Sequence, residues 1–277
     1  MARLVHLSDL HFGAHDERLV EAVAEHIDDL QPDLVVISGD FTQRARTEQF
    51  REACEFLDGL RERGHEVLGV PGNHDVPLYD VLRRFLSPLA RYRRFIDDTL
   101  CPFIELPGVA VLGINTARSL TFKDGRINRD QVDFIRETFA RTSSEAFRVL
   151  VTHHPLFALE VAGEVERAIG RQELALDAVE ESGVDMLLAG HAHHASSQDA
   201  GDLVTRAGGV LVVQAGTATS TRVREQEQSF NVVDIGEGGA TVTIFAWSDD
   251  DFRAKDARRY QWVEGRWKVC EQAEPAH

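Results

Sequence analysis

The chain has 277 residues, of which 43% are hydrophobic and 27% charged, a balance typical of a globular protein. Its formal net charge of −16 at pH 7 repels polyanions at long range, so general nucleic-acid binding is not expected. The three cysteines form no C-x-x-C pair, and no apolar stretch approaches the ~18 residues of a membrane-spanning helix. These features predict a cytoplasmic protein without a disulfide framework or a transmembrane segment.

The first part of the chain alternates between predicted strands and helices. Apolar residues recur at helical spacing in the first helix, and the second strand is a β-branched run typical of burial on both faces. This βαβαβ pattern predicts a parallel sheet covered by helices. The elements in chain order are a strand at residues 2–7, a helix at 18–30, a strand at 33–38, a helix at 47–61 and a strand at 66–70.

After a break at Pro71 and Gly72, residues 76–98 form an Arg-rich helical segment, and the remaining pattern becomes mostly β. No linker or repeat is visible, so we expect a single domain over residues 1–277. The tail after residue 252 either completes a sheet or pairs with another subunit in a homo-oligomer. The later elements are strands at 103–106 and 109–114, a helix at 128–140 capped by Asn128, a strand at 148–152, a helix at 172–181, and strands at 185–188, 209–214, 230–235, 241–247 and 260–263.

Five polar segments each follow a predicted strand. The carboxyl ends of strands in an open parallel sheet share one edge, where ligands bind, so these segments are expected at a single rim. Their donors are imidazole, carboxylate and one amide oxygen, a set that suits Mn, Fe, Co or Zn. The segments are Ser8-Asp9-Leu10-His11, Ser38-Gly39-Asp40, Gly72-Asn73-His74-Asp75, Thr152-His153-His154-Pro155 and Gly190-His191-Ala192-His193.

Taken singly, each segment also has a structural explanation. Gly-Asp after a strand is common turn chemistry, and His-His before Pro can be packed and hydrogen-bonded in a core. Five such segments, all at predicted strand ends, are hard to explain as turns. The sequence therefore predicts that they converge on one multidentate metal site.

This ordered set of motifs resembles the calcineurin-like metallophosphoesterase superfamily, over about residues 4–235. The resemblance implies an α/β fold, a four-layer α/β/β/α sandwich in which two mixed sheets are flanked by helices. It also implies two divalent metal ions per chain (Mn, Fe or Zn) and hydrolysis of phosphodiester bonds by a metal-bridging hydroxide. By match to the family motif, Asp9, His11 and His193 would hold the first ion, Asn73, His153 and His191 would hold the second, and Asp40 would bridge both.

The same match implies a catalytic role for His74, just outside the metal ions, where it would meet the phosphoryl group or protonate the leaving oxygen. Asp75 would orient His74 or cap its turn. His154, Thr217 and Arg222 are candidate substrate contacts, although packing or solvation also explains these positions.

Within the superfamily the chain is similar to bacterial class III cyclic-nucleotide phosphodiesterases, which implies 3′,5′-cyclic nucleotides or similar small phosphodiesters as substrates. The segment at 76–98 would be an amphipathic cap helix with a charged outer face, an anion-binding cap, or a peripheral membrane contact. The membrane contact supports the alternative of a lipid-linked pyrophosphate hydrolase of the UDP-diacylglucosamine type. A DNA-repair-type nuclease would need a larger basic surface, and the complete ligand set argues against a non-catalytic scaffold.

Overall fold

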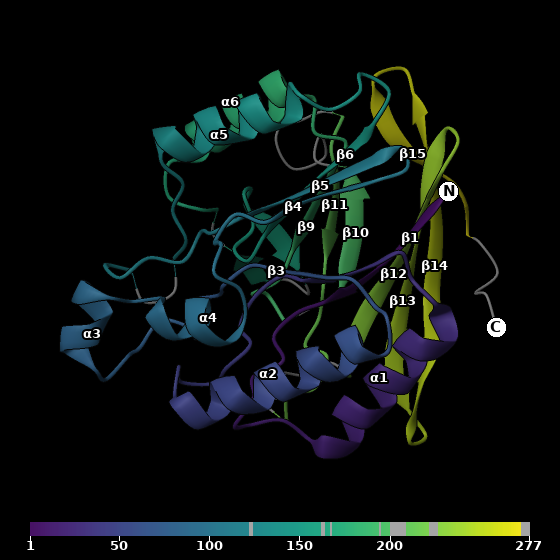
Figure 1. Ribbon diagram of the computed structural model, residues 1–277. Helices are drawn as coiled ribbons and strands as arrows, with labels where there is room; N and C mark the ends of the chain where they lie inside the picture. Colours follow the sequence, from purple (N-terminus) through teal and green to yellow (C-terminus); the bar gives the residue numbers. More distant parts are fainter. Residues whose placement is uncertain are drawn as a thin grey trace.

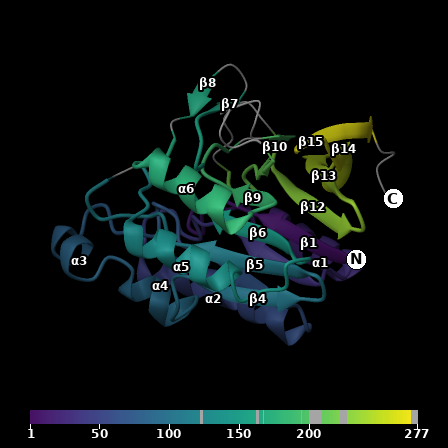
Figure 2. The same cartoon turned by 90° about the horizontal axis from the view of Figure 1, so that it is seen from above.

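Two β-sheets stacked face to face form the middle of the computed structural model, and helices cover the outer face of each (Figure 1). The structure describes residues 1–121, 124–161, 164–166, 168–193, 195–199, 209–221 and 227–272. The view from above looks along this stack, so the layers overlap in it (Figure 2). The predicted four-layer α/β/β/α sandwich is therefore confirmed.

The first sheet contains both ends of the described chain. In chain order its strands and covering helices are β1 (Ala2–Leu7), α1 (Glu17–Leu30), β2 (Leu34–Ile37), α2 (Thr47–Glu62), β3 (Val67–Gly69), β12 (Ser229–Gly236), β13 (Gly239–Ser248), β14 (Asp251–Val263) and β15 (Arg266–Gln272). The strand order is β15-β14-β13-β12-β1-β2-β3. Strands β1, β2 and β3 are parallel, as the βαβαβ pattern predicted. The C-terminal tail completes this sheet as β14 and β15.

The second sheet is built from the middle of the chain. Its strands and helices are β4 (Phe103–Leu106), β5 (Val109–Ile114), α5 (Arg129–Phe139), β6 (Phe147–Thr152), α6 (Gln172–Ser182), β9 (Met186–Ala189), β10 (Ser196–Asp199) and β11 (Leu211–Gln214). The strand order is β10-β11-β9-β6-β5-β4, with β5, β6, β9 and β11 parallel. The sequence pattern missed β10 and the hairpin of β7 (Leu159–Val161) and β8 (Glu164–Glu166), all of which are short.

Alternate residues of the central strands enter two different apolar clusters. Leu34 and Val36 of β2 belong to the cluster between the sheets, whereas Val35 and Ile37 pack in the cluster that contains the buried faces of α1 and α2. A strand buried on both faces has no polar face to show, which is why it appears in the sequence as a continuous β-branched run.

Residues 76–98, which we call the cap, project from one end of the molecule (Figure 1). They form two short helices, α3 (Val81–Leu86) and α4 (Ala90–Phe95), rather than the one cap helix that was among the alternatives for this segment. Pro88 lies between them, and proline ends a helix because it lacks an N–H and its ring clashes with the preceding turn. No helix in the described part of the chain is both long and apolar enough to cross a bilayer.

Candidate metal centre

The five polar segments meet at one edge of the sandwich, where the parallel strands of both sheets end. The first sheet contributes the residues that follow β1, β2 and β3, and the second sheet contributes those that follow β6 and β9. The structure brings together all seven predicted metal ligands: Asp9, His11, Asp40, Asn73, His153, His191 and His193.

Three of these residues form a first cluster around Asp9. Its Oδ1 lies 3.5 Å from Nε2 of His11 and 3.8 Å from Nε2 of His193. The rings of His11 and His193 are stacked, with centroids 5.5 Å apart. Donor atoms that share one cation at about 2.0–2.2 Å lie roughly 3–4 Å from one another. The first cluster therefore has the separations that a single cation requires.

A second cluster surrounds the amide oxygen of Asn73. This Oδ1 lies 3.1 Å from Nε2 of His153 and 3.1 Å from Nδ1 of His191. Nδ1 of His153 lies 2.8 Å from the carbonyl oxygen of Ser38, which can only accept, so the proton of that ring is at Nδ1. Nε2 then presents a lone pair to an amide oxygen, and a cation between two such acceptors would stabilise them.

Asp40 joins the two clusters through one carboxylate oxygen. Its Oδ2 lies 3.9 Å from Nε2 of His11 in the first cluster and 3.5 Å from Nε2 of His153 in the second. Its Oδ1 accepts a hydrogen bond from the backbone N–H of His74 at 2.8 Å. This arrangement is the one expected of a ligand that bridges two cations.

Burial makes this donor set a fit for cations. The side chains of Asp9 and Asp40 are 0% and 1% exposed, and buried carboxylates are strongly unfavourable unless they are paired or hydrogen-bonded. Oδ1 of Asp9 has no hydrogen-bond partner within the described ranges. A buried anionic oxygen without a donor, next to imidazole nitrogens, is suited to metal coordination.

Electrostatics set the protonation states of these groups. Burial raises the pKa of the Asp9 carboxyl, but the imidazoles of His193 and His11 outweigh burial and hold that pKa well below its usual range. The pKa of Asp40 is also lowered, because His153 and neighbouring imidazoles outweigh its burial. Burial and the nearby His153 lower the pKa of His191 to about 4. Near neutral pH the carboxylates are ionised and His191 is neutral, as metal ligands must be.

The backbone at the ligands is strained. Five of the seven predicted ligands have left-handed φ angles, a region that residues with a Cβ rarely adopt. Backbone hydrogen bonds of 3.0 Å hold the loops there, from Asp9 N–H to Gly39 O and from His11 N–H to Asp40 O. A Cβ on Gly72 would overlap the Asp40 carboxylate, so only glycine permits this approach. The angles are 53° at Asp9, 51° at His11, 55° at Asp40, 73° at His191 and 58° at His193.

His74 lies beside the first cluster, on the side that is open to solvent. Its ring centroid is 4.9 Å from that of His11, and the side chain is partly exposed. Its Nδ1 lies 2.8 Å from the carbonyl oxygen of Gln43, which therefore fixes the ring. Gln43 was not predicted from the sequence, because it lies in the loop after β2 and carries no motif of its own.

The hydrogen bonds of the Asp75 carboxylate hold two neighbouring loops together. Its carboxylate accepts hydrogen bonds from the backbone N–H groups of Gly72 and Thr42, both at 2.9 Å, and from the Thr42 hydroxyl at 3.0 Å. Burial and the nearby Asp40 raise its pKa to about 6. These contacts fit the turn-capping alternative, in which Asp75 ties the loop after β3 to the loop after β2.

The three candidate substrate contacts have different surroundings. Oγ1 of Thr217 lies 2.8 Å from Nδ1 of His193, so this hydroxyl contacts a predicted ligand. His154 is buried, with Nδ1 2.8 Å from the Thr116 hydroxyl and its ring centroid 4.7 Å from that of His191. Arg222 lies outside the described residues.

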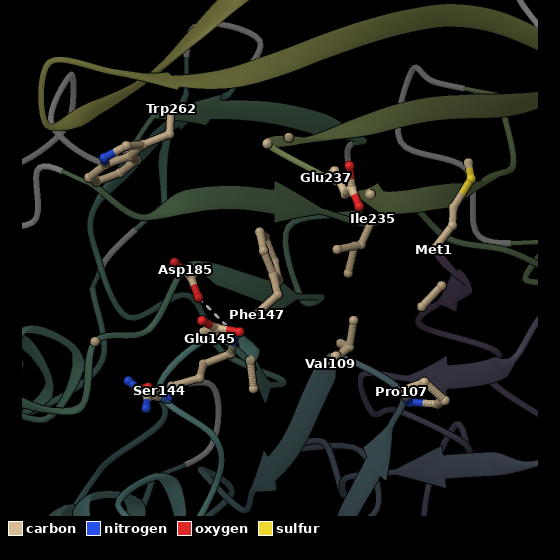
Figure 3. Close-up of a pocket in the computed structure, with 18 of the residues that line it drawn as sticks. Met1, Pro107, Val109, Ser144, Glu145, Phe147, Asp185, Ile235, Glu237 and Trp262 are labelled. Carbon is tan, nitrogen blue, oxygen red and sulfur yellow. Dashed lines mark hydrogen bonds between the residues drawn. The ribbon is translucent and has the colours of Figure 1, made fainter.

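A cavity of about 500 Å³ lies at the opposite end of the sandwich (Figure 3). Its lining includes Met1, Val109 and Phe147, which stand at the amino ends of parallel strands. Within the described ranges, the groups of side chains able to hold a cation all lie at the other edge. The metal chemistry is therefore expected at the carboxyl ends of the strands.

The model of the calcineurin-like phosphoesterase family matches residues 2–195, and the chain belongs to this family. It is 34% identical over 83 residues to the glycerophosphodiester phosphodiesterase GpdQ of Enterobacter lignolyticus, a match that covers 26% of this chain and 29% of GpdQ. It is 36% identical over 159 residues to the UDP-2,3-diacylglucosamine pyrophosphatase LpxG of Chlamydia trachomatis, covering 48% of this chain and 47% of LpxG. The chain thus spans less than half the length of these curated relatives.

A solved structure supports the fold on its own. The purple acid phosphatase PPD1 from yellow lupin (Lupinus luteus) seeds superposes with a TM-score of 0.69 and 13% sequence identity. The superposition covers 91% of this chain and 52% of that protein. At this identity the similarity concerns the arrangement of layers and sheets, and the site must be argued from its own residues.

We expect Asp40→Ala to abolish hydrolysis and to lower the bound metal at both clusters, because one carboxylate oxygen lies between them. The measurement is metal content per chain by elemental analysis, together with turnover of a phosphodiester. Asp185→Asn is the matched control, since Asp185 is a partly buried carboxylate at the opposite end of the sandwich. Near-normal metal content and turnover in Asp40→Ala would show that the site is assigned wrongly.

We expect Thr217→Val to lower metal affinity about 10–100-fold, because it removes the hydrogen bond that orients His193 while preserving the shape of the side chain. Metal titration of the metal-free chain measures this change. If Thr217 instead contacts substrate, as the sequence allowed, the variant will bind metal normally and show a raised KM.

Proposed function

We propose that this chain is a metal-dependent phosphodiesterase that hydrolyses small phosphodiesters such as 3′,5′-cyclic nucleotides. One observation carries the proposal: Oδ2 of Asp40 lies within 4 Å of imidazoles from two separate ligand clusters. A shared carboxylate of this kind is what a dinuclear site for in-line displacement at phosphorus needs. Membership of the calcineurin-like phosphoesterase family supports the same chemistry.

Bound in the two clusters, divalent ions would lower the pKa of water and polarise a phosphoryl oxygen. The chain's own residues do the rest. Asn73, His191 and His193 are partly exposed, whereas Asp9 and Asp40 are buried beneath them, so the substrate approaches from the side of the former three. This layering keeps the carboxylates away from the anionic substrate.

His74 supplies the proton transfer in this proposal. Its Nδ1 proton is donated to the carbonyl oxygen of Gln43, which holds the ring in one orientation. In the imidazolium form, which carries a proton on each nitrogen, Nε2 is the atom that donates a proton to the leaving oxygen or a hydrogen bond to the phosphoryl group. Asp75 contributes indirectly, because it holds the loop on which His74 stands.

A second candidate function is hydrolysis of a lipid-linked pyrophosphate. The observation in its favour is the cap, which continues directly from the Asn73–Asp75 segment and exposes Leu82, Phe85 and Leu86. The match to LpxG, which covers more of this chain than the match to GpdQ, points in the same direction. The cytoplasmic location and the choice among Mn, Fe and Zn stay predictions from the sequence.

We expect His74→Ala to lower kcat by about 10²–10⁴-fold while both metal ions stay bound, because the residue moves a proton without holding a cation. Steady-state kinetics and elemental analysis on the same preparation measure both quantities. His26→Ala, at a histidine that pairs with Asp251 far from the site, controls for the loss of an imidazole. A drop in metal content would make His74 a ligand instead.

One substrate panel separates the two candidates. The chain, loaded with Mn, is assayed with 3′,5′-cyclic AMP, bis(p-nitrophenyl) phosphate, p-nitrophenyl phosphate and a UDP-linked diacylglucosamine in detergent. We expect turnover of the diesters to exceed that of the monoester, with Asp40→Ala as the blank. Turnover of the lipid alone favours the second candidate, and no Asp40-dependent turnover of any compound contradicts both.

A further inference from the structure

The first helix of the cap, α3, exposes its apolar side chains to solvent. Four of the six residues of α3 are large apolar side chains that face solvent: Val81 is 62% exposed, Leu82 72%, Phe85 56% and Leu86 76%. Tyr79, just before the helix, is 73% exposed. A surface helix normally turns its apolar stripe toward the core, and a contiguous apolar patch on a soluble protein marks an interaction site.

The polar contacts of α3 point inward. Arg84 is 3% exposed, and its guanidinium donates to the carbonyl oxygens of Ser119 at 2.7 Å, Pro77 at 3.0 Å and Thr121 at 2.8 Å. Charge-assisted hydrogen bonds of this kind hold the helix firmly. The position of α3 therefore does not depend on burying its apolar residues, which stay available for a contact outside the chain.

The apolar patch lies among positive charges. Besides the buried Arg84, the cap contains four arginines and three aspartates, in a chain whose formal net charge is −16. Arg93 and Arg94 of α4 are exposed. Arg44, from the loop after β2, lies 5.8 Å from the ring centroid of Tyr79. The end of the molecule that carries the metal site therefore presents apolar side chains among arginines, on a protein that is otherwise acidic.

A cavity of about 430 Å³ opens beside the patch. Its lining is mostly apolar and includes Val76, Leu86, Leu89 and Leu100, with Arg118 among the few charged residues. Leu86 belongs both to this lining and to the exposed face of α3. Val76 directly follows the metal-site segment. The apolar surface thus extends from the tip of the cap toward the metal centre.

We propose that the cap docks this protein on a bilayer that contains anionic lipid. Leu82, Phe85 and Leu86 enter the interface between headgroups and acyl chains, and Arg93 and Arg94 contact headgroup phosphates. Apolar insertion combined with basic residues is the chemistry of peripheral membrane binding. Both views show α3 as a protruding tip, a shape that fits a bilayer surface (Figures 1 and 2). A symmetrical dimer through this face would set the arginines of two copies against each other.

The test is co-sedimentation of the full chain with vesicles. One set is pure phosphatidylcholine and the other has one part phosphatidylglycerol to two parts phosphatidylcholine. We expect wild type to bind the anionic vesicles, with binding that weakens as salt rises, and to bind neutral vesicles far less. Leu82→Asp/Phe85→Asp should weaken binding at least tenfold, as should Arg93→Glu/Arg94→Glu.

Matched controls sit on the opposite helical layer. Phe134→Asp removes an apolar side chain on α5 that is 40% exposed, and Arg141→Glu reverses an arginine that is 80% exposed. Both controls should bind anionic vesicles like wild type, and the cap variants and both controls should keep the melting temperature and the turnover of bis(p-nitrophenyl) phosphate. The Asp40→Ala chain should also bind vesicles, which separates docking from catalysis.

Three results would overturn the proposal. In the first, wild type sediments with neither vesicle, and in the second, the cap variants bind as well as wild type. In the third, light scattering shows a dimer that Leu82→Asp/Phe85→Asp converts to monomer without a change in vesicle binding, which would assign the patch to a second copy of the chain. If the double aspartate variant misfolds, Arg93→Glu/Arg94→Glu gives the same decision.

Discussion

The structure depends on keeping two buried carboxylates, Asp9 and Asp40, ionised and close to each other. Negative charges in that position destabilise a folded chain unless donors or positive charge surround them. Imidazoles from both sheets and the backbone N–H of His74 supply part of that compensation. Oδ1 of Asp9 receives no hydrogen bond from the described part of the chain, so this oxygen is suited to contact a cation. The metal site thus follows from electrostatics before any relative is considered.

The same requirement explains where the chain accepts strain. A residue held in a sparsely populated backbone region costs roughly 1–3 kcal/mol, and five ligands are held in the left-handed region. The strands beneath these loops are packed on both faces, which favours one position for each loop. In β2, Val35 and Ile37 are fixed in one apolar cluster and Leu34 and Val36 in another. A one-residue slip would exchange the two sets, so the packed core fixes the ligand positions.

The convergence of the five polar segments was predictable from the sequence, whereas the contacts that support them were not. Convergence of the ligands follows from topology, because each comes after a strand with a clear apolar pattern. Support comes from pairs far apart in the chain, with Thr217 24 residues from His193 and Gln43 31 residues from His74. No local pattern encodes such pairs. Six residues in α3 are likewise too few to show which face is inward, and Arg84 reversed the expectation by binding carbonyls of a distant loop.

Hydrogen bonds hold both ends of the short segment of chain that links the metal centre to the cap. Asp40 accepts from the backbone of His74, Asp75 clamps the neighbouring loop, and the carbonyl of Pro77 accepts from Arg84, which holds α3. A molecule bound to the cap is therefore held at a fixed distance and orientation from the predicted ligands. Cations held in the two clusters would contact only a phosphoryl group, and many molecules carry one. Under the proposed function, selection among phosphoesters therefore depends on surfaces outside the two clusters.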